Sequence, residues 1–232
     1  MKLRAETGSR KNNLLLSFTE PWIFDHPISG GFDLFRRDRE RDDDVGYAYD
    51  EKRVGGDIRF GKEFSEYVKG NIMYKLEEIE IDNLKDNVSQ ALLDERGENR
   101  ISMLAFGIRR DTRDSIFNTT KGYVLNGNFD IAGGALGGDK DFYRWQGRGN
   151  YYIPLKYDSV LEFRGHMGIV NDYGDSNKVP IFERFFAGGA KTIRGYNERK
   201  VGPLDNATED PIGGESIFVA NIEYKVPVLD FI

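Results

Sequence analysis

One stretch decides how the fold is interpreted: Val179-Pro-Ile-Phe-Glu-Arg-Phe-Phe-Ala-Gly-Gly-Ala-Lys-Thr-Ile-Arg-Gly-Tyr196, continued by Asn197-Glu-Arg-Lys-Val-Gly-Pro203. It lies in the longest segment without strand-like alternation, between two segments that alternate well. Compact domains carry loops of this length mainly when the loops are functional. The stretch combines aromatic residues, the pair Gly188-Gly189, and Arg194 between Ile193 and Gly195. Apolar residues around an arginine predict a loop that packs against the rest of the chain.

The composition favours strands joined by turns. The chain has 232 residues and a net charge of −6, with 27 Gly, 12 Tyr, 16 Phe and no Cys. Tyr and Phe prefer strands, and glycine is common in turns. The absence of cysteine excludes disulfides and thiolate metal sites, and with only two histidines we expect no metal and no cofactor. Lys and Arg are scattered instead of forming a stripe, which argues against nucleic acid as a partner.

The sequence contains no helical membrane span and no visible signal peptide. A spanning helix needs about 18 or more consecutive apolar residues, and Met1-Lys-Leu-Arg4 leads into polar residues. A transmembrane barrel strand needs only about 9–11 residues of alternating character. The membrane therefore remains open to a β-protein.

Alternation of period two gives about nine strand candidates. The clearest has Leu161, Phe163, Gly165, Met167 and Ile169 on one face and Glu162, Arg164, His166 and Gly168 on the other. Three more centre on 123–131, 145–153 and 218–226, and weaker ones lie at 14–18, 29–35, 54–60, 68–76 and 101–108. Long apolar faces opposite polar ones are expected of a barrel in lipid, with an apolar outside and a polar lumen. A small soluble barrel would be apolar inside.

The predicted links alternate in length, apart from 134–141. They are 21–28, 38–52, 62–66, 82–100, 112–121, 134–141, 155–159 and 172–216. Short turns on one side and long loops on the other are typical of outer-membrane barrels. Leu84, Val88 and Leu92 are four apart and predict a short helix within 82–100. We therefore predict an all-β fold, an antiparallel up-and-down transmembrane β-barrel, here partial, with long extracellular loops.

Three motifs resemble one family. Phe185-Phe-Ala-Gly-Gly-Ala-Lys-Thr-Ile-Arg-Gly-Tyr196 with Val201-Gly-Pro203 closely resembles the sixth extracellular loop of the BamA superfamily, the outer-membrane β-barrel assembly factors. Ser17-Phe-Thr-Glu-Pro21 resembles the family's strand-to-turn motif. Arg110-Asp-Thr-Arg-Asp114 with Thr120-Lys-Gly122 resembles its mid-barrel periplasmic turn. In the right order, these matches span about residues 12 to 227.

The resemblance implies a domain organisation. Residues 1–232 correspond to a partial C-terminal barrel domain, without the family's periplasmic repeats and without its first and last strands. Residues 172–216 correspond to the long extracellular loop with the Ile-Arg-Gly-Tyr motif. The ending Val228-Leu-Asp-Phe-Ile232 lacks the terminal aromatic that commonly closes an outer-membrane barrel. On this basis we expect a fragment of a longer protein.

The resemblance also implies a function and its residues. The chain is expected to fold and insert β-barrel proteins into the bacterial outer membrane, without a cofactor and not as an enzyme. Its expected partners are outer-membrane lipids, unfolded outer-membrane protein clients and, through the missing periplasmic domains, accessory lipoproteins. The implied functional loop residues are Ile193, Arg194, Gly195 and Tyr196 with Gly188, Gly189 and Phe186, and the turn motif is Asp111, Arg113, Asp114 and Gly122. In the family the loop arginine pairs with acidic residues on later strands, which would lie past Ile232. In this chain Arg194 would instead pair with Glu162 or Glu223 from the polar strand faces, or stay solvated.

Other readings remain open at this point. Within the superfamily they are a two-partner secretion pore or a TamA-like translocation factor. Outside it, an outer-membrane barrel enzyme would need a Ser/His pair near the rim, and no such pair is evident. A soluble β-rich binding domain is the remaining alternative. Aromatic residues near the strand ends predict membrane-interface girdles, and they are Trp22, Tyr123, Tyr151, Tyr152 and Tyr157.

Overall fold

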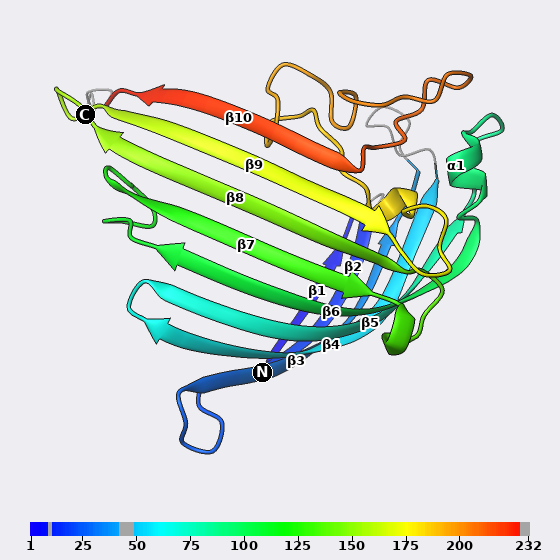
Figure 1. Ribbon diagram of the computed structural model, residues 1–232, viewed down its shortest axis with the longest axis horizontal. Coiled ribbons are helices and arrows are strands. Elements are labelled where there is room, and N and C mark those ends of the chain that lie inside the picture. The colour runs from blue at the N-terminus through cyan, green and yellow to red at the C-terminus, as the bar shows by residue number, and fades with distance from the viewer. Residues whose placement is uncertain (9–10, 42–48, 228–232) are drawn as a thin grey trace.

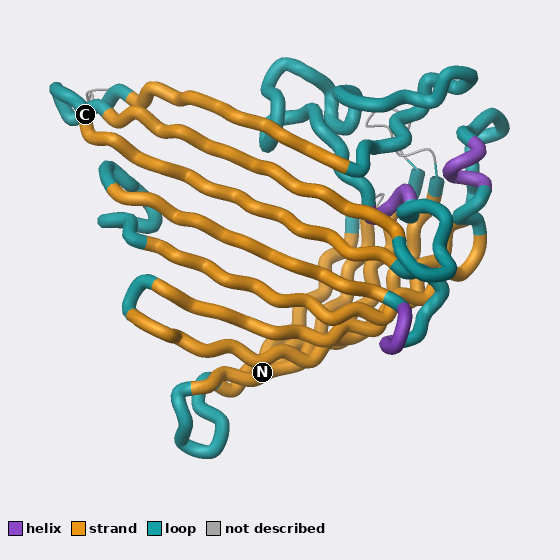
Figure 2. Tube along the Cα trace, in the orientation of Figure 1, coloured by secondary structure: helices purple, strands orange, loops and turns teal. Residues whose placement is uncertain are grey.

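The computed structural model is one curved antiparallel sheet of 10 strands in the order of the sequence; it describes residues 1–8, 11–41 and 49–227. Figures 1 and 2 show the sheet curling so that the first strands lie behind the later ones. The strands are β1 (Lys2–Thr7), β2 (Lys11–Glu20), β3 (Ile28–Arg39), β4 (Asp50–Ser65), β5 (Val68–Asp82), β6 (Gly97–Asp111), β7 (Gly122–Ala132), β8 (Phe142–Pro154), β9 (Val160–Asp172) and β10 (Ser216–Lys225). Within the described residues, β1 and β10 do not pair with each other, so the sheet is unclosed.

This confirms the predicted partial barrel and adds one strand to it. The nine candidates correspond to β2–β10, and β1 was not predicted. β1 pairs with β2 from Lys2 opposite Ser17 to Thr7 opposite Asn12. The strand is short and has only Leu3 and Ala5 as apolar residues on one face. This is too little alternation for a strand to be recognised from the sequence.

The links lie at two ends of the sheet. What we call the turn end, on the left in Figure 1, carries the links 21–27, 66–67, 112–121 and 155–159. The loop end, on the right, carries 83–96, 133–141, 173–215 and the link 40–49, whose middle lies outside the described residues. The predicted helix in the 83–96 link is α1 (Gln90–Leu93), shorter than the spacing suggested. Among the described residues no helix is long and apolar enough to cross a membrane.

The outer, convex face of the sheet is apolar across its middle. Phe163, Leu125 and Ile222 are 38%, 51% and 68% exposed there instead of meeting in a closed interior. On β6 this band is bounded by Arg100 and Arg110, which lie on the same face. At about 3.4 Å per residue the two are about 34 Å apart along the strand, or about 26 Å along the membrane normal at a tilt of about 40°. That height matches the apolar band of about 25 Å in outer-membrane barrels.

The inner face carries charged and polar side chains within the same height, beside apolar ones such as Met103 and Ala105 towards the loop end. Arg59 on β4 contacts Asp33 on β3 at 2.7 Å and Asp57 at 3.0 Å. Its guanidinium also donates to Thr19 at 3.0 Å. Neighbouring strands thus satisfy each other's charges across the inner wall, as buried polar groups require.

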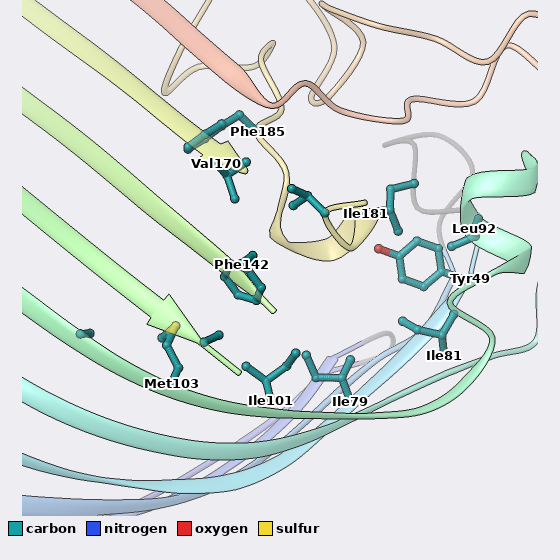
Figure 3. Packing of buried hydrophobic residues seen from close by; sticks show 13 residues of the cluster. Tyr49, Ile79, Ile81, Leu92, Ile101, Met103, Phe142, Val170, Ile181 and Phe185 are labelled. Carbon is teal, nitrogen blue, oxygen red and sulfur yellow. The ribbon is translucent and has the colours of Figure 1, made fainter. Parts of the chain in front are cut away.

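At the loop end the two faces exchange character. Along β5, Leu76 is exposed on the outer face, whereas Ile79 and Ile81 are fully buried on the inner face. They belong to what we call the inner apolar cluster, shown in Figure 3 and made of Tyr49, Ile79, Ile81, Leu92, Ile101, Met103, Ala105, Ala132, Phe142, Val170, Val179, Ile181 and Phe185. The prediction of a polar lumen is therefore wrong for this end of the sheet.

The exchange follows from what each face meets. Beyond Arg100 the outer face carries paired charges, with Lys52 3.0 Å from Glu80 and Arg100 3.7 Å from Glu78. Charges of this kind belong in water, so these strand ends extend past the apolar band. Their inner side is covered by loops, and each fully buried large apolar side chain there contributes about 1.5–3 kcal/mol.

One predicted girdle residue is misplaced. Tyr152 was expected at the membrane interface, but it lies on the inner face of β8 and is only 7% exposed. The side-chain amide of Asn150 lies 3.3 Å from its hydroxyl. Its neighbour Tyr151 is 51% exposed on the outer face. Adjacent tyrosines in a strand must point to opposite faces.

The two faces of the sheet should respond differently to a charge introduced by substitution. Replacing Phe106, on the outer face near the middle of the band, with Lys should destabilise the full-length protein by about 2–4 kcal/mol, because a charge at the bilayer midplane loses its hydration. Asn128→Lys on the inner face of the adjacent strand should have little effect. Equilibrium denaturant unfolding in lipid vesicles measures both, and equal losses would contradict this assignment of faces.

Candidate functional site

The long loop 173–215 begins by packing on the inner wall of the sheet. Its first arm contains a 3-10 turn, η3 (Ile181–Glu183), with Ile181 and Glu183 buried. Figure 3 shows Ile181 facing the cluster residues that come from the strands. The loop is therefore held against the sheet by apolar contacts, as the aromatic and aliphatic residues of this stretch predicted.

A buried charge cluster holds the same arm. The Glu183 carboxylate lies 2.6 Å from the guanidinium of Arg144 on β8 and 3.6 Å from that of Arg53 on β4. Arg144 also contacts Asp130 at 2.7 Å, and Arg53 contacts Glu51 at 3.0 Å. Two strands far apart in the sequence thus meet through one loop carboxylate.

Glu183 is ionised in this setting. Burial acts to raise the pKa of its carboxyl, but the positive charges of Arg144, Lys75 and Arg53 outweigh it and lower the pKa below its ordinary value. A buried charge is tolerated when it is paired and hydrogen-bonded. The cluster therefore fixes the position of the arm, whereas its net contribution to stability is limited by desolvation.

The returning arm of the loop pairs with the first. The backbone of Phe185 exchanges two hydrogen bonds with that of Gly214, at 2.9 and 2.8 Å, and the Val170 amide on β9 donates to the carbonyl of Glu215 at 2.8 Å. Phe186 lies under the guanidinium of Arg199. Both arms are thus joined near the end of β9.

The loop tip depends on glycine. Gly188 and Gly189 have φ values of 108° and 85°, in the region that side chains avoid. A Cβ on Gly188 would lie 2.2 Å from the carbonyl oxygen of Asn197. The Gly189 amide donates to the carbonyl of Tyr196 at 2.9 Å, which closes the tip around Ile193 and Arg194.

Arg194 reaches β10. Its guanidinium lies 3.0 Å from the Glu223 carboxylate, and its side chain is 68% exposed. Glu223 also pairs with Arg164, which lies 3.0 Å from Glu162. Of the two acids considered as partners, Glu223 contacts Arg194 directly. Glu162 lies opposite Glu223 in the pairing of β9 with β10, and its carboxylate contacts Lys225 at 2.5 Å instead.

The turn motif lies at the opposite end of the sheet and is no part of this site. Arg113 contacts Asp111 at 2.8 Å. The Asp114 carboxylate accepts hydrogen bonds from the Thr120 hydroxyl and from the amides of Thr120, Lys121 and Ser115, and these lower its pKa to about 2. Gly122 has a φ of 97°, and a Cβ there would lie 2.4 Å from the Thr112 carbonyl oxygen. These hydrogen bonds fix the turn, and the Asp111 amide also donates to the carbonyl of Tyr67 in the neighbouring turn at 2.9 Å.

The sequence alone did not identify the charges that hold the loop. Glu183 and Arg144 are separated by 39 positions, and no local pattern links them. The available signal was weak: Arg144 lies on the polar face of a predicted strand, and Glu183 is an acid among apolar residues. Within residues 1–8, 11–41 and 49–227 no group of three or more His, Cys, Asp or Glu is arranged to hold a metal ion.

The chain is a curved antiparallel meander with an apolar outer band and a loop folded onto its inner wall. This arrangement is that of a transmembrane β-barrel protein. The profile of the Omp85 superfamily domain matches residues 1–231. The chain belongs to the Omp85 superfamily, and this confirms the resemblance described above.

Individual relatives agree with this assignment. The chain is 34% identical over 222 residues to the outer membrane protein assembly factor BamA of Nitratidesulfovibrio vulgaris, covering 96% of this chain and 27% of that protein. It is 26% identical to BamA of Neisseria meningitidis, covering 87% of this chain and 27% of that protein. A crystal structure of BamA from Haemophilus ducreyi lacking POTRA domains 1-3 superposes with a TM-score of 0.84, at 21% identity, over 99% of this chain and 47% of that chain.

The chain thus spans only about a quarter of the length of these curated relatives. Family and relatives place it in the bacterial outer membrane, as the sequence predicted. The crystal structure, below a quarter identical, supports the fold alone.

The charge cluster predicts a large loss when one partner is removed. Arg144→Ala leaves Glu183 and Asp130 buried without their shared cation, and we expect the seated loop to lose about 3–5 kcal/mol. Hydrogen exchange of the amides in 179–187 measures this opening. The matched control Arg100→Ala breaks an exposed pair and should cost about 0–1 kcal/mol. Equal exchange in the two variants would show that the cluster does not hold the loop.

The lowered pKa of Glu183 predicts a pH dependence with a definite sign. A carboxyl with a lower pKa when folded contributes stability that is complete above its ordinary value of 4.5. That contribution is lost as the pH falls through the folded-state pKa. Denaturant titrations at a series of pH values should show stability falling below pH 4.5 in the parent and less steeply in Glu183→Gln. Parallel curves would contradict the ionised, buried carboxylate.

Proposed function

We propose that this chain is the loop-bearing part of the barrel of an assembly factor that folds and inserts β-barrel proteins into the outer membrane. The single observation that carries the proposal is the loop motif Ile193-Arg194-Gly195-Tyr196 folded back to β10, with Arg194 3.0 Å from Glu223. It is supported by relatives named outer membrane protein assembly factor BamA. Their activity belongs to proteins about four times as long, so its assignment to this chain is a proposal.

The orientation belongs to the same proposal. The loop end would face the cell exterior, so that residues 172–216 form an extracellular loop, and the turn end would face the periplasm. Residues 1–232 would be a partial barrel domain whose first and last strands and periplasmic repeats lie elsewhere in the full-length protein. Accessory lipoproteins would bind through those repeats, unfolded client proteins at the barrel, and outer-membrane lipids at the apolar band.

Insertion in this account needs neither a cofactor nor enzymatic catalysis. Backbone groups in the bilayer must be paired, so an incoming client strand gains by adding to an existing sheet. Burial of lipid-facing side chains supplies the remaining driving force. The protein would supply the template and the local geometry for this addition.

The Arg194–Glu223 pair acts through orientation more than through stability. With Arg194 68% exposed, an ion pair contributes about 0–1 kcal/mol. It nevertheless connects the loop tip to β10, whereas Glu183 connects the loop base to β4 and β8. The loop thus joins distant strands of the inner wall, and we propose that this keeps the barrel in the shape that clients engage.

The inner apolar cluster favours an assembly factor over a secretion pore. A pore of the two-partner type must pass a polypeptide through its lumen. Here the inner side of the loop end is occupied by fully buried residues such as Phe142, Val170 and Val179. A secretion pore or a TamA-like factor built on this chain would have to displace them in each transport cycle.

The proposal is tested by Arg194→Ala in the full-length protein. We expect assembly of client barrels into vesicles to slow roughly fivefold, which corresponds to the ~1 kcal/mol upper range of an exposed ion pair, while the barrel itself still folds. Lys191→Ala, an exposed cation of the same loop, serves as the matched control. Arg194→Lys, which keeps a positive charge beside Glu223 without disturbing the pair of Glu223 with Arg164, should retain part of the rate. Normal assembly by Arg194→Ala would sink the proposed role.

A further inference from the structure

Phe185 occupies a socket on the inner wall of β9. Phe185 is 8% exposed, and the tip of its ring lies over Gly168. A Cβ added to Gly168 would lie 2.6 Å from Cζ and 2.9 Å from Cε1 of Phe185. Contacts below 3.0 Å are overlaps, so the ring can occupy this place only because residue 168 has no side chain.

The sides of the socket are also defined. The His166 ring meets the Phe185 ring edge to face, with centroids 6.3 Å apart and an interplanar angle of 78°, a favourable arrangement for two aromatic rings. Val170 is fully buried and belongs with Phe185 to the inner apolar cluster. Figure 3 shows Phe185 beside Val170 near the end of β9. These neighbours limit the room into which the ring could move, so a side chain at 168 would displace the ring from the socket.

The socket fixes both arms of the loop. Phe185 pairs through its backbone with Gly214 on the returning arm. The tip that carries Arg194 lies between these two arms, and Glu223 is on β10, the neighbour of β9. The distance between Arg194 and Glu223 therefore depends on where Phe185 sits relative to β9.

We infer that Gly168 is a positioning residue: it admits the Phe185 ring, and so sets the place of the whole loop and of Arg194 on the inner wall. The socket stands on packing alone. Its consequence for assembly rests on the proposed function of the loop.

The reason for glycine here is space, not backbone conformation. Gly168 lies inside β9 and is absent from the glycines with positive φ, so the backbone conformation does not require glycine. Apart from the Phe185 ring, the close contact of an added Cβ would be the carbonyl oxygen of Trp145 on β8, at 3.1 Å. Gly165 on the same strand offers the matched control. It faces outward, and an added Cβ there would meet nothing within 4 Å. The two substitutions are chemically identical and differ only in the face of β9 that they alter.

The test uses a reporter thiol in the full-length protein. Val179 is fully buried at the loop base, so Val179→Cys should react slowly with a maleimide polymer while the loop is seated. Adding Gly168→Ala should accelerate labelling about tenfold or more, because overpacking a filled site opens the loop. Gly165→Ala should leave the rate unchanged. Heat-modifiable gel mobility confirms that each barrel is folded. Equal labelling in the Gly168→Ala and Gly165→Ala proteins would overturn the inference.

A second pair of variants distinguishes the loss of the socket from a general failure of Gly168→Ala to fold. With Phe185→Ala the ring is gone, and the remaining close contact of a Cβ at 168 is the Trp145 carbonyl oxygen at 3.1 Å. Adding Gly168→Ala to Phe185→Ala should therefore change labelling and folding far less than it does in the parent. An equally large increase in labelling in both backgrounds would show that Gly168 acts by another route and would overturn the inference. Client assembly is then measured separately. Fast labelling with normal assembly would uphold the socket and count against the proposed role of the loop.

Discussion

The structure depends on one constraint: each face of a strand must suit the medium it meets, and the medium changes along the strand. Between Arg100 and Arg110 the outer face meets lipid and is apolar, while the inner face carries paired charges such as Arg59 with Asp33 and becomes apolar towards the loop end, where Met103 belongs to the inner apolar cluster. Past Arg100 the outer face meets water and the inner face meets packed loops. The same strand therefore reverses its sidedness without any change of period.

This reversal creates the inner apolar surface on which the long loop packs. Apolar residues that point inward at the loop end form a surface on which Ile181 and Phe185 are buried. Apolar contacts alone would not fix the position of the loop along the inner face, because they are not directional. Glu183, held by Arg144 and Arg53, gives one fixed point, and the fit of Phe185 over Gly168 gives another. The exposed tip can then present Arg194 to Glu223 at little cost.

Much of the fold follows from the sequence because period two survives in the strongest strands. Leu161 to Ile169 alternate as predicted, and the loop motif identified the family. β1 lacked enough apolar positions to be recognised. The inner cluster was missed although a signal exists: in Glu78-Ile79-Glu80-Ile81 the apolar residues move to the opposite parity from Ile72, Tyr74 and Leu76. The ion pairs of Glu183 were not predictable, since they join residues brought together only by the curvature of the sheet.

The most direct measurement of the reversal is a spin-label scan along β5 in lipid vesicles, from position 72 to position 81. Labels at 72, 74 and 76 should be accessible to oxygen dissolved in the bilayer, and those at 78 and 80 to a water-soluble paramagnetic nickel complex. Labels at 79 and 81 should be shielded from both. Lipid accessibility continuing through 78 and 80, or water reaching 79 and 81, would contradict the account.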